Sequence, residues 1–517
     1  MGERIPMHRR ALLHSALAGL FAESLPRLVP PAAAAGEARP FDFETVIERA
    51  RATAAAPHVG RRMDLAPPFA GLGYDAYRAI RFHDAERLFA DDHGFRMDLL
   101  PPGFNFRDRV AVNLVAHGTA RPLAFSADLF DFDPDHFPGH EGQPPSETTQ
   151  DMGFSGIRIR HPINRPGVWD EVAVFQGASY FRANARDTLF GLSARGLAIG
   201  TAGPGGEEFP VFTEFWVQEP QPGAGTLRLA ALLDSASLAG AYEIAITPGA
   251  ETVMDLRAVL FPRRDIAQAG IAPLTSMYYF GPENRAGVDD FRDAVHDSGG
   301  LRIVTGSGER IWRPLRNPGA VEVSAFADTG PRGFGLIQRD RDFAHFQDAE
   351  AHYERRPSAW VEPIGDWGPG AVMLFELPAD RDFADNIVAF WRPEAPLRAG
   401  ARQEFSYRLT WTPVPAEPLP LARVIATRGG RSIHDAGERL LVVDFDLGEV
   451  DLASLAPRAT ASAGEIRGLS IAPLPGGNLA RVGFHFAPGA RREIEFRLVL
   501  ERAGVPASEV WLYRWSA

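Results

Sequence analysis

Hydrophobic and polar residues alternate along many short stretches of the chain. In EFSYRLTW, residues 404–411, the aromatic and aliphatic side chains fall on one face of a strand and the polar side chains on the other. Similar runs, separated by Gly, Pro and Asp turns, lie at 110–115, 242–246, 253–261, 440–445 and 494–501. Many short alternating strands predict an all-β chain built as β-sandwiches rather than a parallel α/β sheet.

One stretch near the start has helical spacing instead. Phe43, Val46, Ile47 and Ala50 lie at i, i+3, i+4 and i+7. Because these positions share one face of a helix, the spacing predicts a helix over 43–54.

A proline-rich segment, TPVPAEPLPLA, suggests a division into domains. Its prolines, at positions 413, 415, 418 and 420, cannot donate to a sheet ladder and favour an extended linker. We therefore expect a large β domain over 36–412, a linker over 413–420 and a small domain over 421–517. The last has the length of an immunoglobulin-like sandwich.

Residues 1–35 have the features of a secretory signal peptide. Arg9 and Arg10 precede an apolar run, 11–22, and Ala-rich sequence suited to cleavage extends to Ala35. The run is too short to span a membrane, so we expect export and no membrane span. The paired arginines resemble a twin-arginine signal, which implies export after folding.

Composition narrows the partners and the chemistry. A net charge of −12 argues against nucleic acid or an anionic membrane surface and is compatible with a neutral sugar. The chain has no Cys, which excludes thiolate nucleophiles and Cys-bound metals. All 54 basic residues are Arg, which excludes Schiff-base and phosphate-loop chemistry that needs Lys.

Two short stretches resemble known functional motifs but lack residues that those motifs require. DFDPDHFPGHEG, residues 131–142, begins like a calcium loop but lacks its turn glycine and its bidentate glutamate. GLSAR, residues 191–195, lacks the second glycine of a nucleophile elbow. We expect no metal site and no cofactor.

The stretch FADNIVAFWRP, residues 383–393, leaves two interpretations open. Asp385 and Asn386 stand directly before an apolar run that predicts a strand. Asp and Asn both favour turns, so the pair is compatible with a simple turn before the strand. The alternative is a carboxyl group at the rim of a pocket, placed for proton transfer.

Several long segments of unusual composition carry a resemblance. They are ASYFRANARDTLFGLSARGLAIGTAGPGGEEFPVFTEFW, APLTSMYYFGPENR, VHDSGGLRI, ERIWRPLRNP, GFGLIQRDRDFAHFQDAEAHYERRPSAWVEPIGDWG and the Asp385 segment. In this order they resemble the periplasmic glucans biosynthesis protein G/D family, from about Phe41 onward. The resemblance implies a large galactose-mutarotase-like β-sandwich with a long cleft, followed by a small immunoglobulin-like β-sandwich.

The resemblance also implies a location, partners and a reaction. It implies a periplasmic protein that acts on osmoregulated periplasmic glucans, forms a homodimer and works beside the glucan synthase machinery. The reaction implied is inverting endo-hydrolysis of β-1,2-glucan. Transglycosylation with cyclisation, or non-catalytic glucan binding as a scaffold, are the alternatives.

Three residues match the family's catalytic positions. Asp385 would be the general acid, Asp297 of HDS the base, and Tyr353 would support them. Two carboxyl groups are what inverting hydrolysis requires. We expect Phe383, Phe390 or Trp391 to desolvate Asp385 and raise its pKa, and Asp297 to lie in an exposed turn and stay ionised.

Aromatic and arginine side chains in the same segments are candidates for sugar binding. Tryptophan offers a flat apolar face for a sugar ring, and arginine offers donors to its hydroxyls. Each tryptophan could equally belong to a sandwich core, and Arg313 and Arg356 could form structural ion pairs. The candidates are Arg195, Trp216, Trp312, Arg313, Arg356, Trp360 and Trp367.

Four departures from the family pattern affect the details. Gly299, Ala384 and Phe390 replace residues that are usually polar or tyrosine in relatives. The Pro-rich loop 131–150 is longer than is typical. These differences bear on the proton path and on the loop over the cleft.

Overall fold

The computed structural model describes residues 37–60, 62–84, 88–89, 91–138, 152–285, 287–413 and 421–517. The predicted signal peptide and nearly all of the predicted linker lie outside them. Within the described residues strands dominate, which confirms the β-rich prediction. The helices are α1 (Phe43–Ala55), α2 (Tyr74–Arg78) and α3 (Phe343–Phe346), with 3-10 turns η1 (Asp91–His93), η2 (Ala127–Leu129), η3 (Tyr353–Arg355) and η4 (Leu452–Ser454). In this part of the chain, no helix has the length and apolar character needed to cross a membrane.

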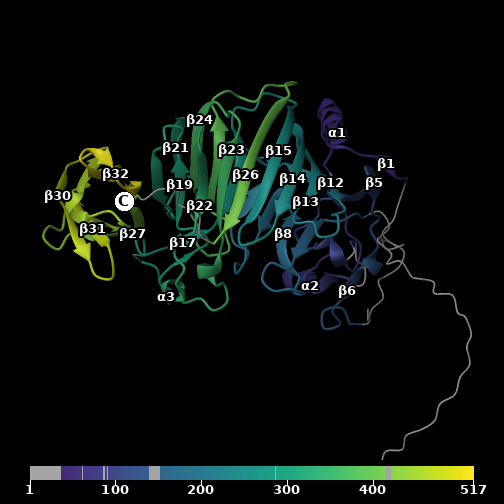
Figure 1. The fold of residues 1–517 in the computed structure, drawn as a ribbon, viewed down its shortest axis with the longest axis horizontal. Helices are drawn as coiled ribbons and strands as arrows, with labels where there is room; N and C mark the ends of the chain where they lie inside the picture. Colours follow the sequence, from purple (N-terminus) through teal and green to yellow (C-terminus); the bar gives the residue numbers. More distant parts are fainter. Residues whose placement is uncertain are drawn as a thin grey trace, which may run out of the picture.

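Most strands belong to two large sheets (Figure 1). The 16-stranded sheet runs β1 (Arg39–Pro40), β5 (Thr119–Pro122), β4 (Ala111–Ala116), β12 (Val211–Gln218), β13 (Leu227–Asp234), β14 (Leu238–Thr247), β15 (Thr252–Pro262), β26 (Gln403–Thr412), β23 (Ser358–Ile364), β22 (Gly333–Ile337), β19 (Gly300–Val304), β20 (Arg310–Pro314), β34 (Val510–Ser516), β32 (Glu493–Arg502) and β29 (Ala456–Ala461), with β33 (Val505–Pro506) on β32. The ten-stranded sheet runs β21 (Glu322–Thr329), β24 (Pro369–Glu376), β25 (Ile387–Pro393), β16 (Ala269–Ser276), β10 (Ser193–Arg195), β9 (Tyr180–Ala183), β8 (Asp170–Gln176), β7 (Gly156–His161) and β3 (Arg96–Leu100), with β11 (Leu197–Ile199) on β16.

The main core lies between these two sheets. One buried cluster contains Leu233 and Leu256 of the 16-stranded sheet together with Leu274, Leu374 and Trp391 of the ten-stranded sheet. Each buried leucine contributes about 2 kcal/mol of hydrophobic stabilisation. The two sheets therefore pack face to face, as the alternating strands predict. The specific fold names stay predictions.

Helix α1 confirms the helical spacing near the start of the chain. The Asp42 side chain accepts a hydrogen bond from the Thr45 backbone N–H and caps the helix. Val46, Ile47 and Ala50 are buried in a separate cluster on the outer face of β13, β14 and β15. The helix thus covers the side of the 16-stranded sheet that faces away from the main core.

The C-terminal residues form a second packed unit that stays joined to the large sheet. A four-stranded sheet runs β27 (Arg423–Arg431), β28 (Arg439–Asp446), β31 (Leu479–Phe486) and β30 (Ile466–Leu474). Its core includes Phe484 and Trp511, together with Trp312 and Ile337 from the body of the molecule. Strand β34 pairs in parallel with β20, so the 16-stranded sheet continues into the C-terminal residues. The domain boundaries given above stay a prediction.

Two small two-stranded sheets lie beside the large ones. Strand β2 (Ile80–Phe82) pairs with β6 (Phe130–Phe132), and β17 (Tyr278–Phe280) pairs with β18 (Val295–His296). The second, the β17–β18 hairpin, matters most, because Asp297 follows β18 directly.

Candidate active site

Asn386 fixes the segment that carries Asp385. The Asn386 side chain accepts a hydrogen bond from the Tyr278 backbone N–H (2.8 Å) and donates to the carbonyls of Tyr278 (2.9 Å) and Leu377 (3.0 Å). These bonds tie the loop before β25 to the β17 hairpin. Asn386 is therefore structural, while the Asp385 side chain stays 37% exposed. Of the Asp-Asn pair, Asn386 is the anchor and Asp385 keeps a partly exposed carboxyl group.

Asp297 lies in a buried turn, which corrects the expectation of an exposed one. Its backbone N–H donates to the Met277 carbonyl (2.9 Å), and its side chain is 13% exposed. Burial, together with the negative charge of Asp385, raises the pKa of Asp297 to about 6. The positive charges of Arg356 and Arg182 oppose this shift.

The structure brings the three predicted catalytic residues together. Arg182 Nη2 lies 3.8 Å from Asp385 Oδ2, and Arg356 Nε lies 3.4 Å from Asp297 Oδ1. Burial raises the pKa of the Tyr353 hydroxyl above its usual range, and the charge of Asp297 raises it further. Two carboxyl groups, two arginines and one phenol thus share one electrostatic environment.

The expected desolvation of Asp385 by its apolar neighbours is not present. Phe383 is exposed, Phe390 packs against Phe375, and Trp391 belongs to the main core. Since strand residues alternate between faces, the two buried rings serve packing and leave Asp385 open to the cleft.

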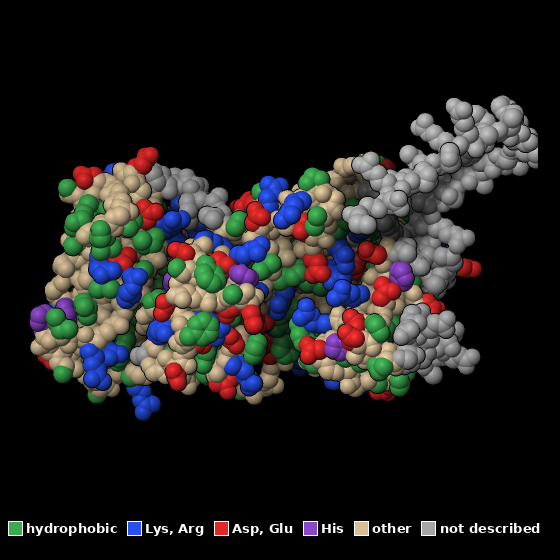
Figure 2. Space-filling model, turned by 90° about the horizontal axis from the view of Figure 1, so that it is seen from below, with side chains coloured by type: hydrophobic (Ala, Val, Ile, Leu, Met, Phe, Trp, Pro, Cys, Tyr) green, Lys and Arg blue, Asp and Glu red, His purple; other side chains and the backbone are tan. Residues whose placement is uncertain are grey.

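A groove of about 770 Å³ leads to this centre. Seen from below, the molecule is hollowed between the part that carries α3 and the part that carries α2 (Figure 2). The lining comes from α2, β2, β7, β8 and β9 and ends at Tyr180, Arg182 and Phe190. Because Arg182 also lies 3.8 Å from Asp385, the groove adjoins the carboxyl pair at this arginine.

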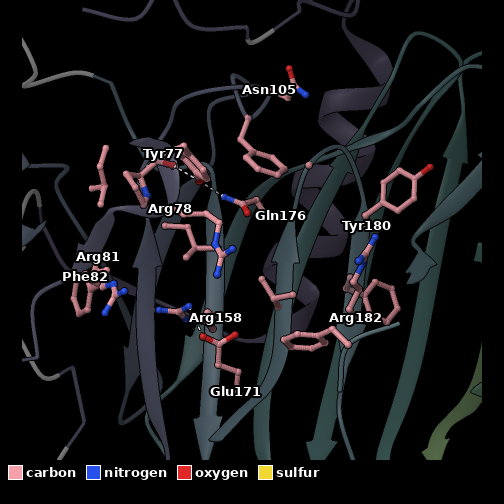
Figure 3. Close-up of a pocket in the computed structure, with 18 of the residues that line it drawn as sticks. Tyr77, Arg78, Arg81, Phe82, Asn105, Arg158, Glu171, Gln176, Tyr180 and Arg182 are labelled. Carbon is pink, nitrogen blue, oxygen red and sulfur yellow. Dashed lines mark hydrogen bonds and ion pairs between the residues drawn. The ribbon is translucent and has the colours of Figure 1, made fainter. Parts of the chain in front are cut away.

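Polar and aromatic side chains share the floor of the groove (Figure 3). Gln176 Nε2 donates to the Tyr77 hydroxyl (2.6 Å), and the rings of Tyr77 and Phe106 lie 5.4 Å apart. Arg158 is held by Asp98 and Glu171. Sequence reasoning missed these residues, because nothing local shows that α2 folds over β8. For Tyr180 and Arg182 the signal was present, since both lie in the first of the segments that carry the resemblance.

Two predicted arginines lie at or beneath the site. Arg356 reaches Asp297 across Gly191, where an added Cβ would stand 3.1 Å from the Arg356 side chain. Arg195 is buried, with its Nη1 2.7 Å from Glu207 Oε1 and its guanidinium 5.0 Å from the Tyr180 ring centre. Arg195 therefore supports the groove wall from behind.

The predicted tryptophans do not line the groove, because protein contacts cover them. Trp216 packs against Phe41 and Arg49 beside α1, and Trp312 lies beneath Arg339 with 3.6 Å between ring centre and guanidinium. Trp360 lies beneath Arg302. Trp367 is buried among Trp391, Phe405 and Tyr407.

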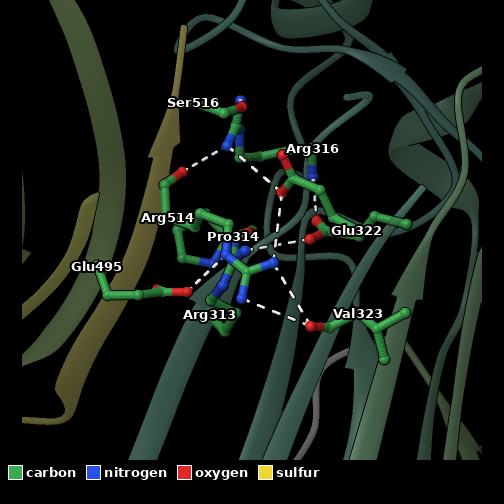
Figure 4. Close-up of polar contacts among 9 residues, drawn as sticks. Arg313, Pro314, Arg316, Glu322, Val323, Glu495, Arg514 and Ser516 are labelled. Carbon is green, nitrogen blue, oxygen red and sulfur yellow. Dashed lines mark hydrogen bonds and ion pairs between the residues drawn. The ribbon is translucent and has the colours of Figure 1, made fainter. Parts of the chain in front are cut away.

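Arg313 forms a structural ion pair instead of a sugar contact. Its Nη2 lies 3.1 Å from Glu376 Oε2, and both side chains are 1% exposed. It belongs to a polar network in which Arg316 reaches the Arg514 carbonyl and the Ser516 hydroxyl of β34 (Figure 4). The network joins the body of the molecule to the C-terminal strand.

Among the described residues, His296, Asp340 and His345 place ligand atoms within 4.8 Å of one another. Gln338 Nε2 lies 3.1 Å from His296 Nδ1, so this nitrogen already has a hydrogen-bond partner. Burial raises the pKa of Asp340, and nearby positive charges, among them Arg339 and Arg341, lower it. These arginines oppose a further cation, so we assign no metal to this group.

Comparison with known proteins gives one consistent result. Residues 41–515 match a family described as "Periplasmic glucan biosynthesis protein, MdoG". "Glucans biosynthesis protein G" of Rhodopseudomonas palustris is 44% identical over 516 residues, 99% of this chain and 100% of the relative. The proteins of the same description from Vibrio cholerae (44% over 480 residues) and Shewanella frigidimarina (43% over 482 residues) each cover 92% of this chain, and 87% and 85% of their own length.

Proposed function

The chain belongs to the periplasmic glucan biosynthesis protein family, and from this premise we propose that it is an inverting endo-acting hydrolase of β-1,2-glucan. The observation that carries the proposal is the convergence of Asp297, Asp385 and Tyr353 beside Arg182, an arginine that also lines the groove. These residues lie far apart in the sequence, and only the fold brings them together.

Inverting hydrolysis assigns one role to each carboxyl group. Asp297 accepts a proton from water, whose oxygen attacks the anomeric carbon on the face opposite the leaving group. The glycosidic C–O bond breaks, and the proton of Asp385 passes to the leaving oxygen. A base with a pKa of about 6 is ionised at neutral pH yet still accepts a proton readily.

Asp385 needs a proton before the bond breaks, and the substrate itself can favour it. In the free protein the carboxyl group is partly open to water and lies near Arg182. A glucan chain that covers Asp385 excludes this water, and desolvation favours the neutral acid. Arg182 Nε donates to the Ser193 hydroxyl (2.8 Å), which holds the arginine beside the groove.

Tyr353 suits a supporting role in proton transfer. Its raised pKa keeps the phenol protonated, so it can donate a hydrogen bond toward Asp297 or toward the attacking water. A relay through the phenol or sugar hydroxyls could join a water to the base when the two are not in direct contact.

The deciding experiment is incubation of the purified protein with linear β-1,2-glucan, followed by sizing of the products. We expect shortened chains, released with inverted anomeric configuration in NMR spectra recorded early in the reaction. Asp385→Asn should abolish shortening while the protein keeps its melting temperature. Wild-type protein that leaves the glucan intact on long incubation would contradict the proposal.

The same assay separates the two alternatives. A transglycosylase that closes rings gives products lighter by one water than linear chains of equal length. A scaffold protein binds glucan before and after Asp385→Asn and never changes its length.

A further inference from the structure

Two phenylalanine side chains near the catalytic pair stand open to solvent. Phe383 is 90% exposed and Phe291 is 78% exposed. Isolated exposed apolar residues are common and need no explanation. These two differ, because Phe291 adjoins Arg292 in the chain and Phe383 adjoins Asp382, to which Arg292 binds.

Arg292 is the centre of that cluster. Its guanidinium binds both carboxylate oxygens of Asp290 (3.0 and 2.8 Å), and Nη1 also binds Asp348 (2.8 Å) and Asp382 (3.0 Å). The Phe291 ring lies 5.8 Å from the same guanidinium. Charge-assisted bonds of this kind fix side chains that would otherwise be mobile.

The cluster holds three chain segments, around 290, 348 and 382, beside the active site. The charges of Asp382 and Arg292 both act on the Tyr353 hydroxyl, and Asp385 follows Phe383 by two residues. The groove described above is lined from α2 and β2 to β9, whereas the Arg292 cluster binds Asp348 just after α3. The molecule is hollowed between the part that carries α3 and the part that carries α2 (Figure 2).

We propose that Phe291 and Phe383 form a second sugar-binding surface, which holds the glucan chain on the side of the scissile bond opposite the groove. The inference rests on the proposed function, because endo-cleavage requires the chain to be held on both sides of the broken bond. Sugar rings present apolar C–H faces that stack on aromatic rings, and their hydroxyls bond to flanking polar groups. Arg292 supplies such a group beside the Phe291 ring, and Asp382, which it binds, directly precedes Phe383.

Binding measured without turnover tests this surface directly. In an Asp385→Asn background, we would titrate long and short linear β-1,2-glucans by calorimetry into the parent and into Phe291→Ala/Phe383→Ala. We expect about tenfold weaker binding of the long chains, the loss of two modest stacking contacts. Chains short enough to fill only the groove should bind with unchanged affinity. Ile433→Ala, which removes a hydrophobic side chain that is 91% exposed, is the matched control and should bind normally.

Two results would overturn the proposal. One is equal affinity of parent and double variant for long chains. The other is a change from dimer to monomer in sedimentation with affinity unchanged, which would assign the rings to contact between two copies of the chain. Because both substituted side chains are exposed, the variants should keep the parent's melting temperature.

Failure of this proposal can be told apart from failure of the hydrolase proposal. If wild type never shortens glucan but the double variant still binds long chains more weakly, the surface stands and the hydrolase does not. If wild type shortens glucan, and Phe291→Ala/Phe383→Ala with Asp385 intact has the same KM for long chains as wild type, the second binding surface is wrong and the hydrolase proposal stands.

Discussion

At the scale of single residues, the two carboxyl groups lie in environments opposite to those that the sequence suggests. Asp297, beside Ser298 and Gly299, looks like part of an open turn, but the β17–β18 hairpin buries it. Asp385 stands near apolar residues, but Phe383 is exposed, and Phe390 and Trp391 are buried in separate clusters on the two faces of β25. In the proposed mechanism burial therefore tunes the base, and the substrate desolvates the acid.

This difference predicts a pH profile. Asp297 must be ionised to act as base, so kcat/KM should fall as pH drops below about 6, the value to which burial raises its pKa. The Arg356 charge lowers that pKa. Removing it in Arg356→Gln should raise the pKa and move the acidic limb to higher pH.

The measurement is kcat/KM for glucan shortening between pH 4.5 and 8. Arg355→Gln, a substitution at the exposed neighbouring position, is the control and should leave the limb in place. If the limb stays in place in Arg356→Gln as well, Asp297 is not the group that titrates.

The candidate catalytic residues lie near one another in the structure, whereas the candidate tryptophans do not line the groove. Asp297, Tyr353 and Asp385 lie in segments that match the family in their order along the chain. This order can be read from the sequence alone. A tryptophan gives no such information, because the same ring serves a core or a cleft. Trp216 is covered by α1 and Trp312 by Arg339, and neither partner is close in sequence.

At the scale of elements, alternation predicted strands well and their partners poorly. The runs at 242–246, 253–261 and 404–411 are parts of β14, β15 and β26. The pairing of β20 with β34 joins residues about 200 positions apart, and no local pattern encodes it. Strand β22, GFGLI, is buried on both faces, so its buried and exposed positions do not alternate.

The pair Arg313–Glu376 joins the two large sheets, since β20 carries the arginine and β24 the glutamate. Glu376→Ala leaves a buried guanidinium without its partner and deprives the Arg316 backbone N–H of its acceptor. We expect the free energy of unfolding to fall by about 3–5 kcal/mol, measured by urea denaturation.

An exposed pair provides the comparison. Arg408 and Asp255 lie 2.8 Å apart but are about half exposed, so Asp255→Ala should cost less than about 1 kcal/mol. Arg313→Met/Glu376→Leu, which replaces both charges, should recover most of the stability. Equal, small losses in Glu376→Ala and Asp255→Ala would show that the buried pair does not hold the sheets together.

At the scale of the whole molecule, a polar cavity lies where the C-terminal sheet meets the body. It has a volume of about 360 Å³ and is lined by Glu283, His296 and Trp312 on one side and by Arg428 and Asp444 on the other. The Tyr278 hydroxyl donates to Glu283 and ties this carboxyl group to the hairpin that leads to Asp297. Protonation at the junction is thereby connected to the active-site hairpin.

Glu283 makes the stability of the junction dependent on pH. Burial raises its pKa from 4.5 to about 7, partly offset by the Tyr278 hydrogen bond. Between these values the folded protein holds a proton that the unfolded chain has lost, so the free energy of unfolding falls as pH rises from 4.5 to 7.

Glu283→Gln, which cannot ionise, should remove the part of this fall in the free energy of unfolding that comes from Glu283. Since part of the side chain faces the cavity, we expect the variant to gain about 2 kcal/mol relative to wild type between pH 5 and pH 8. Urea denaturation at both pH values measures the difference between the two proteins. A constant difference between the two proteins would mean that Glu283 is already ionised at pH 5, and that the junction is held by packing alone.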